Sequence, residues 1–326
     1  MSEEYEPDLV SVIIPTYNRA KHLIEAMDSV QNQTYRPIEL IVVDDGSTDC
    51  TKMSVEVYAA GLAREQGLEL QYIPRSNQGP EAARNQGLRV ARGKYVRFLD
   101  SDDWLLPQAT AVQMDVLKKS EADVCYGSWL EMCDGFPGTR ERQGVFTAEL
   151  NPDPVAALLG DQWCPNFCYL ILCEWALKVG GWTEHYGPLE DRDFINRIAL
   201  NGAMFVGTSS QIGCYRQHPG PRLSREDRER WMQNMKRVIF DGIEWLNVNS
   251  EWTEARREAV ANSLFLHARR FHGVDRSQFR ECIQTLREFS PHFRPHGSIY
   301  PLAVWALGYE CAESLRQFCR RLLRRI

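Results

Sequence analysis

The sequence lacks several features that would assign a protein class at once. No apolar run reaches the about 18 to 20 residues that cross a bilayer, and the first ten residues, MSEEYEPDLV, have neither the basic nor the apolar region of a secretory signal. The ten cysteines include no second pair at the spacing of a zinc site. We therefore expect a cytoplasmic protein whose cysteines are reduced and act as small apolar residues.

The sequence also has fewer basic than acidic residues. The chain has 38 Lys and Arg against 44 Asp and Glu, a net charge of −6, which argues against a general nucleic-acid-binding protein. The charge is uneven, because residues 1–224 carry 20 basic and 31 acidic side chains whereas residues 225–326 carry 18 and 13. The two regions are therefore expected to meet different surroundings.

The first part of the chain alternates short apolar runs with helical patterns. Strands are predicted at residues 10–14, 38–43, 68–73, 95–99 and 124–132. Helices are predicted at about residues 20–31, 50–65, 82–91 and 108–119. This order is typical of an α/β protein with a parallel sheet. From Arg225 onward the pattern is helical only.

Acidic residues follow two of the predicted strands. Asp45, after the second strand, could accept hydrogen bonds from a nucleobase or ribose, or could cap the next turn. Asp100 and Asp102, after the fourth strand, offer oxygen ligands that suit Mg²⁺ or Mn²⁺ on a diphosphate, although an acidic helix-capping turn has the same composition. Open parallel sheets bind ligands at the carboxyl ends of their strands, so these acids are expected to line one cleft.

Two further positions could carry chemistry. Glu190 and Asp191 lie at the start of a predicted helix, whose dipole keeps a carboxylate ionised as a potential base. Helix capping is the alternative interpretation. His218 could serve as a ligand through its imidazole, or could be structural.

Taken in order, the motifs resemble glycosyltransferase family 2 with the GT-A fold. The resemblance is carried by residues 12–19, 42–49, 77–85 and 93–103, and continues more thinly to about residue 224. It implies an α/β fold with a Rossmann-like, mostly parallel central sheet flanked by helices, to which the helical pattern after Arg225 adds a helical C-terminal region. The expected division is a catalytic domain over residues 1–224, with a nucleotide-binding half at about 9–118 and an acceptor-side half at about 119–224, followed by helices over 225–326.

The resemblance also implies roles for single residues. Asp45 would contact the base, usually uracil, and Asp191 would be the catalytic base with Glu190 beside it. Asp102 and Asp100, with His218, would hold Mn²⁺ or Mg²⁺. The full set implied for nucleotide and donor binding is Pro15, Thr16, Tyr17, Arg19, Asp45, Asn77, Gly79, Arg84, Asn85, Asp100, Ser101, Asp102, Arg222 and Ser224. Candidates for the wall of the sugar pocket are Trp163, Asn166, Trp182 and His185.

The implied activity is inverting, metal-dependent transfer of a hexosyl or N-acetylhexosaminyl group. The donor would be a nucleoside-diphosphate sugar, with a UDP-sugar favoured, and the acceptor a hydroxyl of a glycan or lipid-linked molecule in cell-surface polysaccharide or glycoconjugate synthesis. A non-catalytic sugar-nucleotide-binding protein of the same fold is one alternative. A sugar nucleotidyltransferase is a weaker one, because it would be expected to carry a Gly-rich phosphate loop after the first strand.

The helical residues 225–326 carry no motif that resembles a known site. They could cap the catalytic domain, or form a homodimer through their apolar faces. They could also contact an anionic membrane surface through five arginines of the last predicted helix, namely Arg316, Arg320, Arg321, Arg324 and Arg325.

Overall fold

The computed structural model describes residues 5–62, 67–134, 140–217, 227–295, 304 and 308–317. Contacts between Cα atoms divide the chain into two compact units. The sheet unit comprises residues 1–154, 163–186 and 190–222, and the helical unit comprises residues 155–162, 187–189 and 223–326. The strands and helices predicted before residue 135 are confirmed, with their ends shifted by a few residues.

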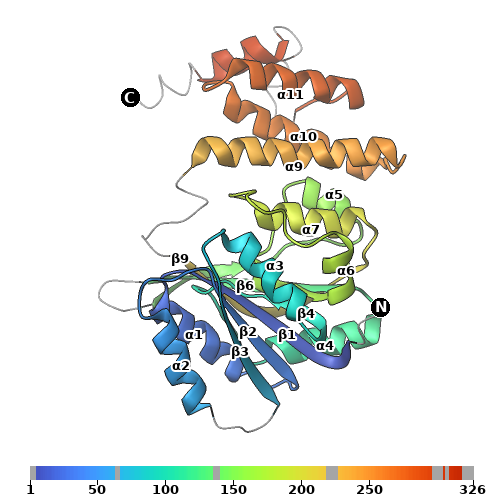
Figure 1. Cartoon of the computed structure of the whole chain (residues 1–326). Helices are drawn as coiled ribbons and strands as arrows, with labels where there is room; N and C mark the ends of the chain where they lie inside the picture. Colours follow the sequence, from blue (N-terminus) through green and yellow to red (C-terminus); the bar gives the residue numbers. More distant parts are fainter. Residues whose placement is uncertain are drawn as a thin grey trace. The chain divides into compact units, whose positions relative to one another are not determined.

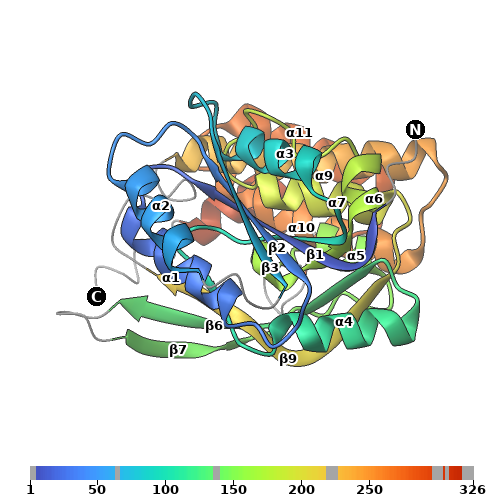
Figure 2. The ribbon, with the colours of Figure 1, turned by 60° about the horizontal axis from the view of Figure 1, so that its bottom comes forward.

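The first half of the sheet is parallel. Its strands, in spatial order, are β3 (Leu68–Pro74), β2 (Ile38–Asp44), β1 (Glu6–Thr16) and β4 (Gly93–Phe98). The chain moves outward from β1 to β3 and then returns across β1 to form β4. Right-handed crossovers therefore put α1 (Ala20–Gln31) and α2 (Thr51–Gly61) on one face and α3 (Pro80–Val90) on the other (Figures 1 and 2). The direction of the strand order reverses between β1 and β4, which is the point where open α/β sheets bind ligands at the carboxyl ends of their strands.

The second half of the sheet is mixed. Antiparallel β8 (Leu170–Leu172) joins β4 to β6 (Val124–Asp134), and β6 runs parallel to the long β9 (Phe205–Gln217). The short β5 (Trp104–Leu105) pairs with β9, and β7 (Arg140–Phe146) pairs with β6. Helix α4 (Ala109–Ser120) packs on β6 and β9 (Figure 2). As a result, the end of β9 returns to the turn after β4, where the Arg216 amide donates to Asp103 at 2.8 Å.

A buried arginine braces the join between the two halves. Arg97 on β4 is fully buried and donates to the Phe167 carbonyl at 3.3 Å and to Gln113 on α4. Gln113 in turn donates to the carbonyls of Cys125 and Cys168, at 3.0 and 2.7 Å. Burial lowers the pKa of Arg97 to about 10. The brace fixes the 3₁₀ turn η1 (Asn166–Cys168) against the sheet.

The helical unit contains α5 (Pro154–Leu159), α9 (Arg228–Val248), α10 (Glu254–Phe271) and α11 (Arg276–Phe289). The three long helices begin at side-chain caps, where Asp227, Thr253 and Asp275 accept from backbone amides two to three residues later. Helix α10 packs against both α9 and α11. Within the described part of the chain, no helix is both long and apolar enough to span a membrane.

Candidate active site

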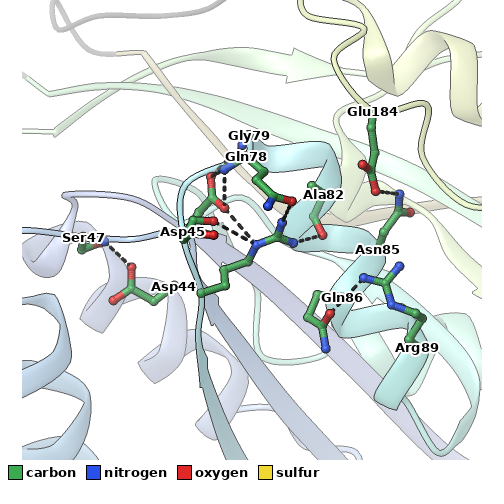
Figure 3. A network of polar contacts seen from close by, with 12 residues as sticks. Asp44, Asp45, Ser47, Gln78, Gly79, Ala82, Asn85, Gln86, Arg89 and Glu184 are labelled. Atoms are coloured by element: carbon green, nitrogen blue, oxygen red, sulfur yellow. Dashed lines mark hydrogen bonds and ion pairs between the residues drawn. The ribbon is translucent and has the colours of Figure 1, made fainter.

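Asp45 is held at the end of β2 by the loop that follows β3 (Figure 3). Its buried carboxylate accepts from the Gly79 amide at 2.8 Å and from the Gln78 amide at 3.1 Å. The Arg75 guanidinium lies 3.2 Å from the same carboxylate. Gly79 has a φ of +96°, which favours glycine at this point of the loop. Residues 75–79 thus fix the position of the Asp45 carboxylate and place the Arg75 guanidinium beside it.

Asn18 ties the segment after β1 to the loop after β2. Its side-chain oxygen accepts from the main-chain amides of Thr48 and Asp49, at 2.7 and 3.3 Å, and the main-chain N–H of Asn18 donates to the Ser47 hydroxyl at 2.9 Å. Next to Asn18, Tyr17 is 47% exposed. The Thr16 hydroxyl is buried and has no hydrogen-bond partner among the described residues.

The acidic turn after β4 keeps two partly exposed carboxylates, each beside a cation. Asp100 lies 2.6 Å from an Arg84 nitrogen, and its second oxygen is 3.4 Å from the Asn166 amide nitrogen. Asp102 forms an ion pair with Arg19. The side chains of Asp100 and Asp102 are 30% and 18% exposed, so a ligand can reach both.

The acidic turn after β4 has the oxygen ligands needed to bind a divalent cation together with the phosphates of a nucleotide. Among the residues that the structure describes, no three His, Cys, Asp or Glu side chains gather into a metal-binding group. Mg²⁺, however, is commonly held by one or two carboxylates together with the phosphates of a substrate. Asp100 and Asp102 supply such a pair of oxygen ligands, whereas His218, Arg222 and Ser224 lie outside the described residues.

Glu190 and Asp191 are the first two residues of α7 (Glu190–Leu200), where the helix dipole favours negative charge. Asp191 is half-buried and accepts from the Trp163 indole N–H at 2.8 Å. Glu190 is more enclosed. Burial raises the pKa of Glu190 to about 8, with Arg84 opposing the shift and the charge of Asp191 adding to it. Asp191 is therefore the more accessible carboxylate of the pair.

Arg84 on α3 is buried between two acids. Its guanidinium contacts Asp100 at 2.6 Å and Glu190 at 3.2 Å, and it lies 4.3 Å from the centre of the Trp182 ring. The adjacent acids keep the pKa of Arg84 raised although burial alone would lower it. The family resemblance implied that Arg84 takes part in nucleotide and donor binding. In the structure its charge is compensated by these two carboxylates.

Asn85 and Trp182 serve the packing beside Arg84. Asn85 accepts from the Trp182 amide at 2.8 Å and donates to the Trp182 carbonyl at 2.9 Å. The Trp182 ring stacks on Phe194 with centroids 4.4 Å apart and is 2% exposed, so it belongs to the core rather than to an open pocket wall. Of the remaining predicted residues, Pro15 is the penultimate residue of β1, Ser101 is buried in the acidic turn, and Asn77 is exposed in the loop after β3. His185 is exposed in the loop between α6 and α7.

The comparisons with known proteins agree with this geometry. A model of the family described as "Glycosyl transferase family 2" matches residues 11–172. Glycosyltransferase GlyG from Streptococcus pneumoniae is 35% identical over 245 residues, which are 72% of this chain and 80% of GlyG. The chain belongs to glycosyltransferase family 2. It spans about half the length of another relative, an uncharacterized glycosyltransferase from Haemophilus influenzae that is 38% identical over 126 residues, with 39% of this chain and 48% of that protein covered.

Two solved structures share the fold of this family 2 chain. Residues 1–349 of TarS from S. aureus, in complex with UDP-GlcNAc, superpose with a TM-score of 0.65 at 23% identity, covering 86% of this chain and 81% of that one. The mannosyltransferase PcManGT from Pyrobaculum calidifontis, in complex with GDP-Man and Mn²⁺, gives a TM-score of 0.54 at 17% identity over 95% and 86% of the two chains. The predicted GT-A fold is thereby confirmed.

The sequence analysis did not predict the roles of Asn18 and Arg75. It named Trp163 for the wall of the sugar pocket but did not predict the contact of its indole N–H with Asp191. Arg75 lies beside Asp45 because β2 and β3 pair with Asp44 opposite Pro74, a register that the structure shows and that the sequence did not predict. The contacts of Asn18 and of the Trp163 indole depend on how loops approach each other, and no local sequence pattern predicts them.

Proposed function

We propose that this chain transfers a hexosyl or N-acetylhexosaminyl group, with inversion, from a UDP-sugar to a hydroxyl of a glycan or lipid-linked acceptor. The observation that carries the proposal is the position of Arg84, whose guanidinium contacts both Asp100 and Glu190. Arg84 therefore links the acidic turn, which is proposed to bind the metal, to the carboxylate pair Glu190 and Asp191, which is proposed to supply the base. Cell-surface polysaccharide or glycoconjugate synthesis is the process that we propose for the product.

The donor would bind at the carboxyl ends of β1, β2 and β4, where the strand order reverses. The fixed carboxylate of Asp45 suits the imide N–H of uracil, which is a donor, and the exposed Tyr17 ring could cover a base. The unpartnered Thr16 hydroxyl and the exposed Asn77 side chain are further polar groups at the same strand ends. The complex of TarS with UDP-GlcNAc supports the choice of a UDP-sugar.

Asp100 and Asp102 would hold Mn²⁺ or Mg²⁺, with His218 as the proposed further ligand, and the Mn²⁺ complex of PcManGT supports this assignment. When bound there, the cation neutralises negative charge on the diphosphate leaving group. Arg19, now paired with Asp102, would become free to meet the diphosphate, which Arg222 and Ser224 are proposed to cover.

Asp191 would act as the general base. It would take the proton of the acceptor hydroxyl while that oxygen forms a bond to the anomeric carbon and the bond to the diphosphate breaks. A single displacement of this kind inverts the anomeric configuration and needs one base, whereas retaining glycosidases use two carboxylates. Glu190 would orient the acceptor beside it.

Calorimetric titration with UDP, GDP and dTDP, each with and without Mn²⁺, tests the donor part of the proposal. We expect UDP to bind only in the presence of the metal. Incubation with UDP-GlcNAc and an acceptor panel, followed by NMR of the anomeric proton, tests transfer and inversion. Binding without turnover would favour the non-catalytic alternative, and the absence of any nucleotide binding would contradict the proposal.

For residues 225–326 we propose a contact with the inner face of the membrane that brings lipid-linked acceptors to the site. The support is their excess of basic side chains, 18 against 13 acidic ones. Sedimentation with anionic vesicles tests it, with zwitterionic vesicles as the control. Equal partitioning into both would remove the proposal, and analytical ultracentrifugation of the same samples would detect a homodimer.

A further inference from the structure

We infer that Trp163 is a positioning residue for the catalytic base, and that its indole N–H fixes the Asp191 carboxylate in the orientation that receives the acceptor proton. The inference rests on the proposed role of Asp191. It starts from one hydrogen bond between two half-buried side chains, 2.8 Å from the indole nitrogen to one oxygen of Asp191.

In the hydrogen bond between Trp163 and Asp191, the indole is always the hydrogen-bond donor and the carboxylate the acceptor. An indole N–H only donates, so it cannot compete with Asp191 for the acceptor proton. The other carboxylate oxygen accepts from the Arg192 amide in the first turn of α7 at 2.8 Å. With one donor on each oxygen, the plane of the carboxylate is defined, and each oxygen retains a lone pair for an incoming hydroxyl.

The indole is itself held by aromatic rings from the mixed half of the sheet. Trp163 meets Trp129 of β6 edge to face, with centroids 5.7 Å apart and planes at 82°, and meets Tyr215 of β9 at 5.7 Å and 79°. Trp129 in turn stacks on Phe146 of β7 at 5.9 Å. Rotation of the indole would disturb contacts to two strands, so the direction of its N–H is set by the sheet and not by α7.

The main chain next to Trp163 is equally constrained. Cys164 is buried, and the brace formed by Arg97 and Gln113 holds the carbonyls of Phe167 and Cys168 a few residues later. Trp163 therefore connects the Asp191 carboxylate to the packed strands β6 and β9 and to the turn that Arg97 and Gln113 hold. Loss of the N–H should leave the nucleotide-binding loops intact and free the carboxylate to rotate.

The test is Trp163→Phe, which retains an aromatic ring but removes the donor. We expect kcat to fall roughly 10- to 100-fold, the worth of one hydrogen bond to a charged group. The KM for the UDP-sugar and the Kd of UDP with Mn²⁺ should stay within about twofold of wild type, because Asp45 and the acidic turn are untouched.

Trp175→Phe is the matched control, because Trp175 lies on α6 (Cys173–Lys178), where its ring contacts Lys178, and it should behave as wild type. If Trp163→Phe also lost UDP binding, Trp163 would be a structural residue and the inference would be wrong. If Trp163→Phe transferred sugar at the wild-type rate while Asp191→Asn was inactive, the inference alone would fail. If Asp191→Asn remained active, the proposed base would be wrong instead.

Discussion

The Arg84 guanidinium lies 3.2 Å from the Glu190 carboxylate, although the two residues are 106 positions apart in the sequence. Arg84 comes from α3 beside the parallel strands, and Glu190 begins α7. This contact holds the helix that carries Asp191 against the helix that follows the Asp45 loop. It thus aligns the proposed base with the proposed donor site.

Arg84→Met should destabilise the protein by about 3 to 5 kcal/mol, because it leaves Glu190 and Asp100 without the buried cation that compensates them. Urea denaturation measures the free energy of unfolding. Arg84→Lys keeps the charge but not the two-pronged geometry, so it should recover only part of the loss. A loss for Arg84→Met no larger than that of an exposed ion pair, about 1 kcal/mol or less, would contradict this account.

Glu190 should make stability depend on pH. Burial raises its pKa from 4.5 to about 8, so the folded state binds this proton more tightly than the unfolded state. Its stabilising contribution is complete below pH 4.5 and is lost as the pH rises through about 8. Glu190→Gln should therefore gain stability relative to wild type over that interval, measured by urea denaturation at a series of pH values. Asp115→Asn, at an exposed pair with Lys119, should show no such trend.

Asp191→Asn should reduce sugar transfer by about 10² to 10⁴-fold, because an amide cannot accept the acceptor proton. The Kd of UDP with Mn²⁺ should change little, since Asp191 lies on the acceptor side of the network. Initial rates with a UDP-sugar and calorimetry on the same protein give both numbers. A large loss of nucleotide affinity would argue that Asp191 serves the donor.

Arg19→Met should tighten binding of Mn²⁺ to the nucleotide-free protein by roughly 2- to 5-fold, the worth of a partly exposed ion pair. The metal and Arg19 would otherwise compete for the Asp102 carboxylate. Asp102→Ala should have the opposite effect and abolish the metal dependence of UDP binding. Titration of Mn²⁺ followed by electron paramagnetic resonance distinguishes the variants, and equal affinities would exclude competition by Arg19.

Arg75→Met should weaken UDP binding about 10-fold, because the buried Asp45 carboxylate loses its charge partner and the loop that carries Gln78 and Gly79 loosens. Arg89→Met is a matched control, since Arg89 is exposed on α3 and its guanidinium donates to Gln86, away from Asp45 (Figure 3). Calorimetry at one metal concentration compares them. The same affinity for both variants would show that Arg75 does not support Asp45.

The sequence alone predicted the parallel half of the fold and the acids at its strand ends. Buried parallel strands are nearly continuous apolar runs, and apolar residues recur about every 3.6 positions in the helices between them. Both patterns are local, so they can be recognised in the sequence. The mixed half of the sheet was harder to predict from the sequence, because β5 has two residues and β8 has three, too few to show a strand pattern. Their pairing depends on partners far along the chain.

The sequence by itself determined which residues could do chemistry, namely the acids after β2 and β4 and at the start of α7. Only the tertiary structure decided which of them meet. Trp163 reaches Asp191 across 28 positions, and Arg84 reaches Asp100 and Glu190 across 16 and 106. Contacts of this kind depend on how the mixed strands pack beside the parallel ones. Side-chain periodicity specifies a buried face, but it does not specify which distant face will cover it.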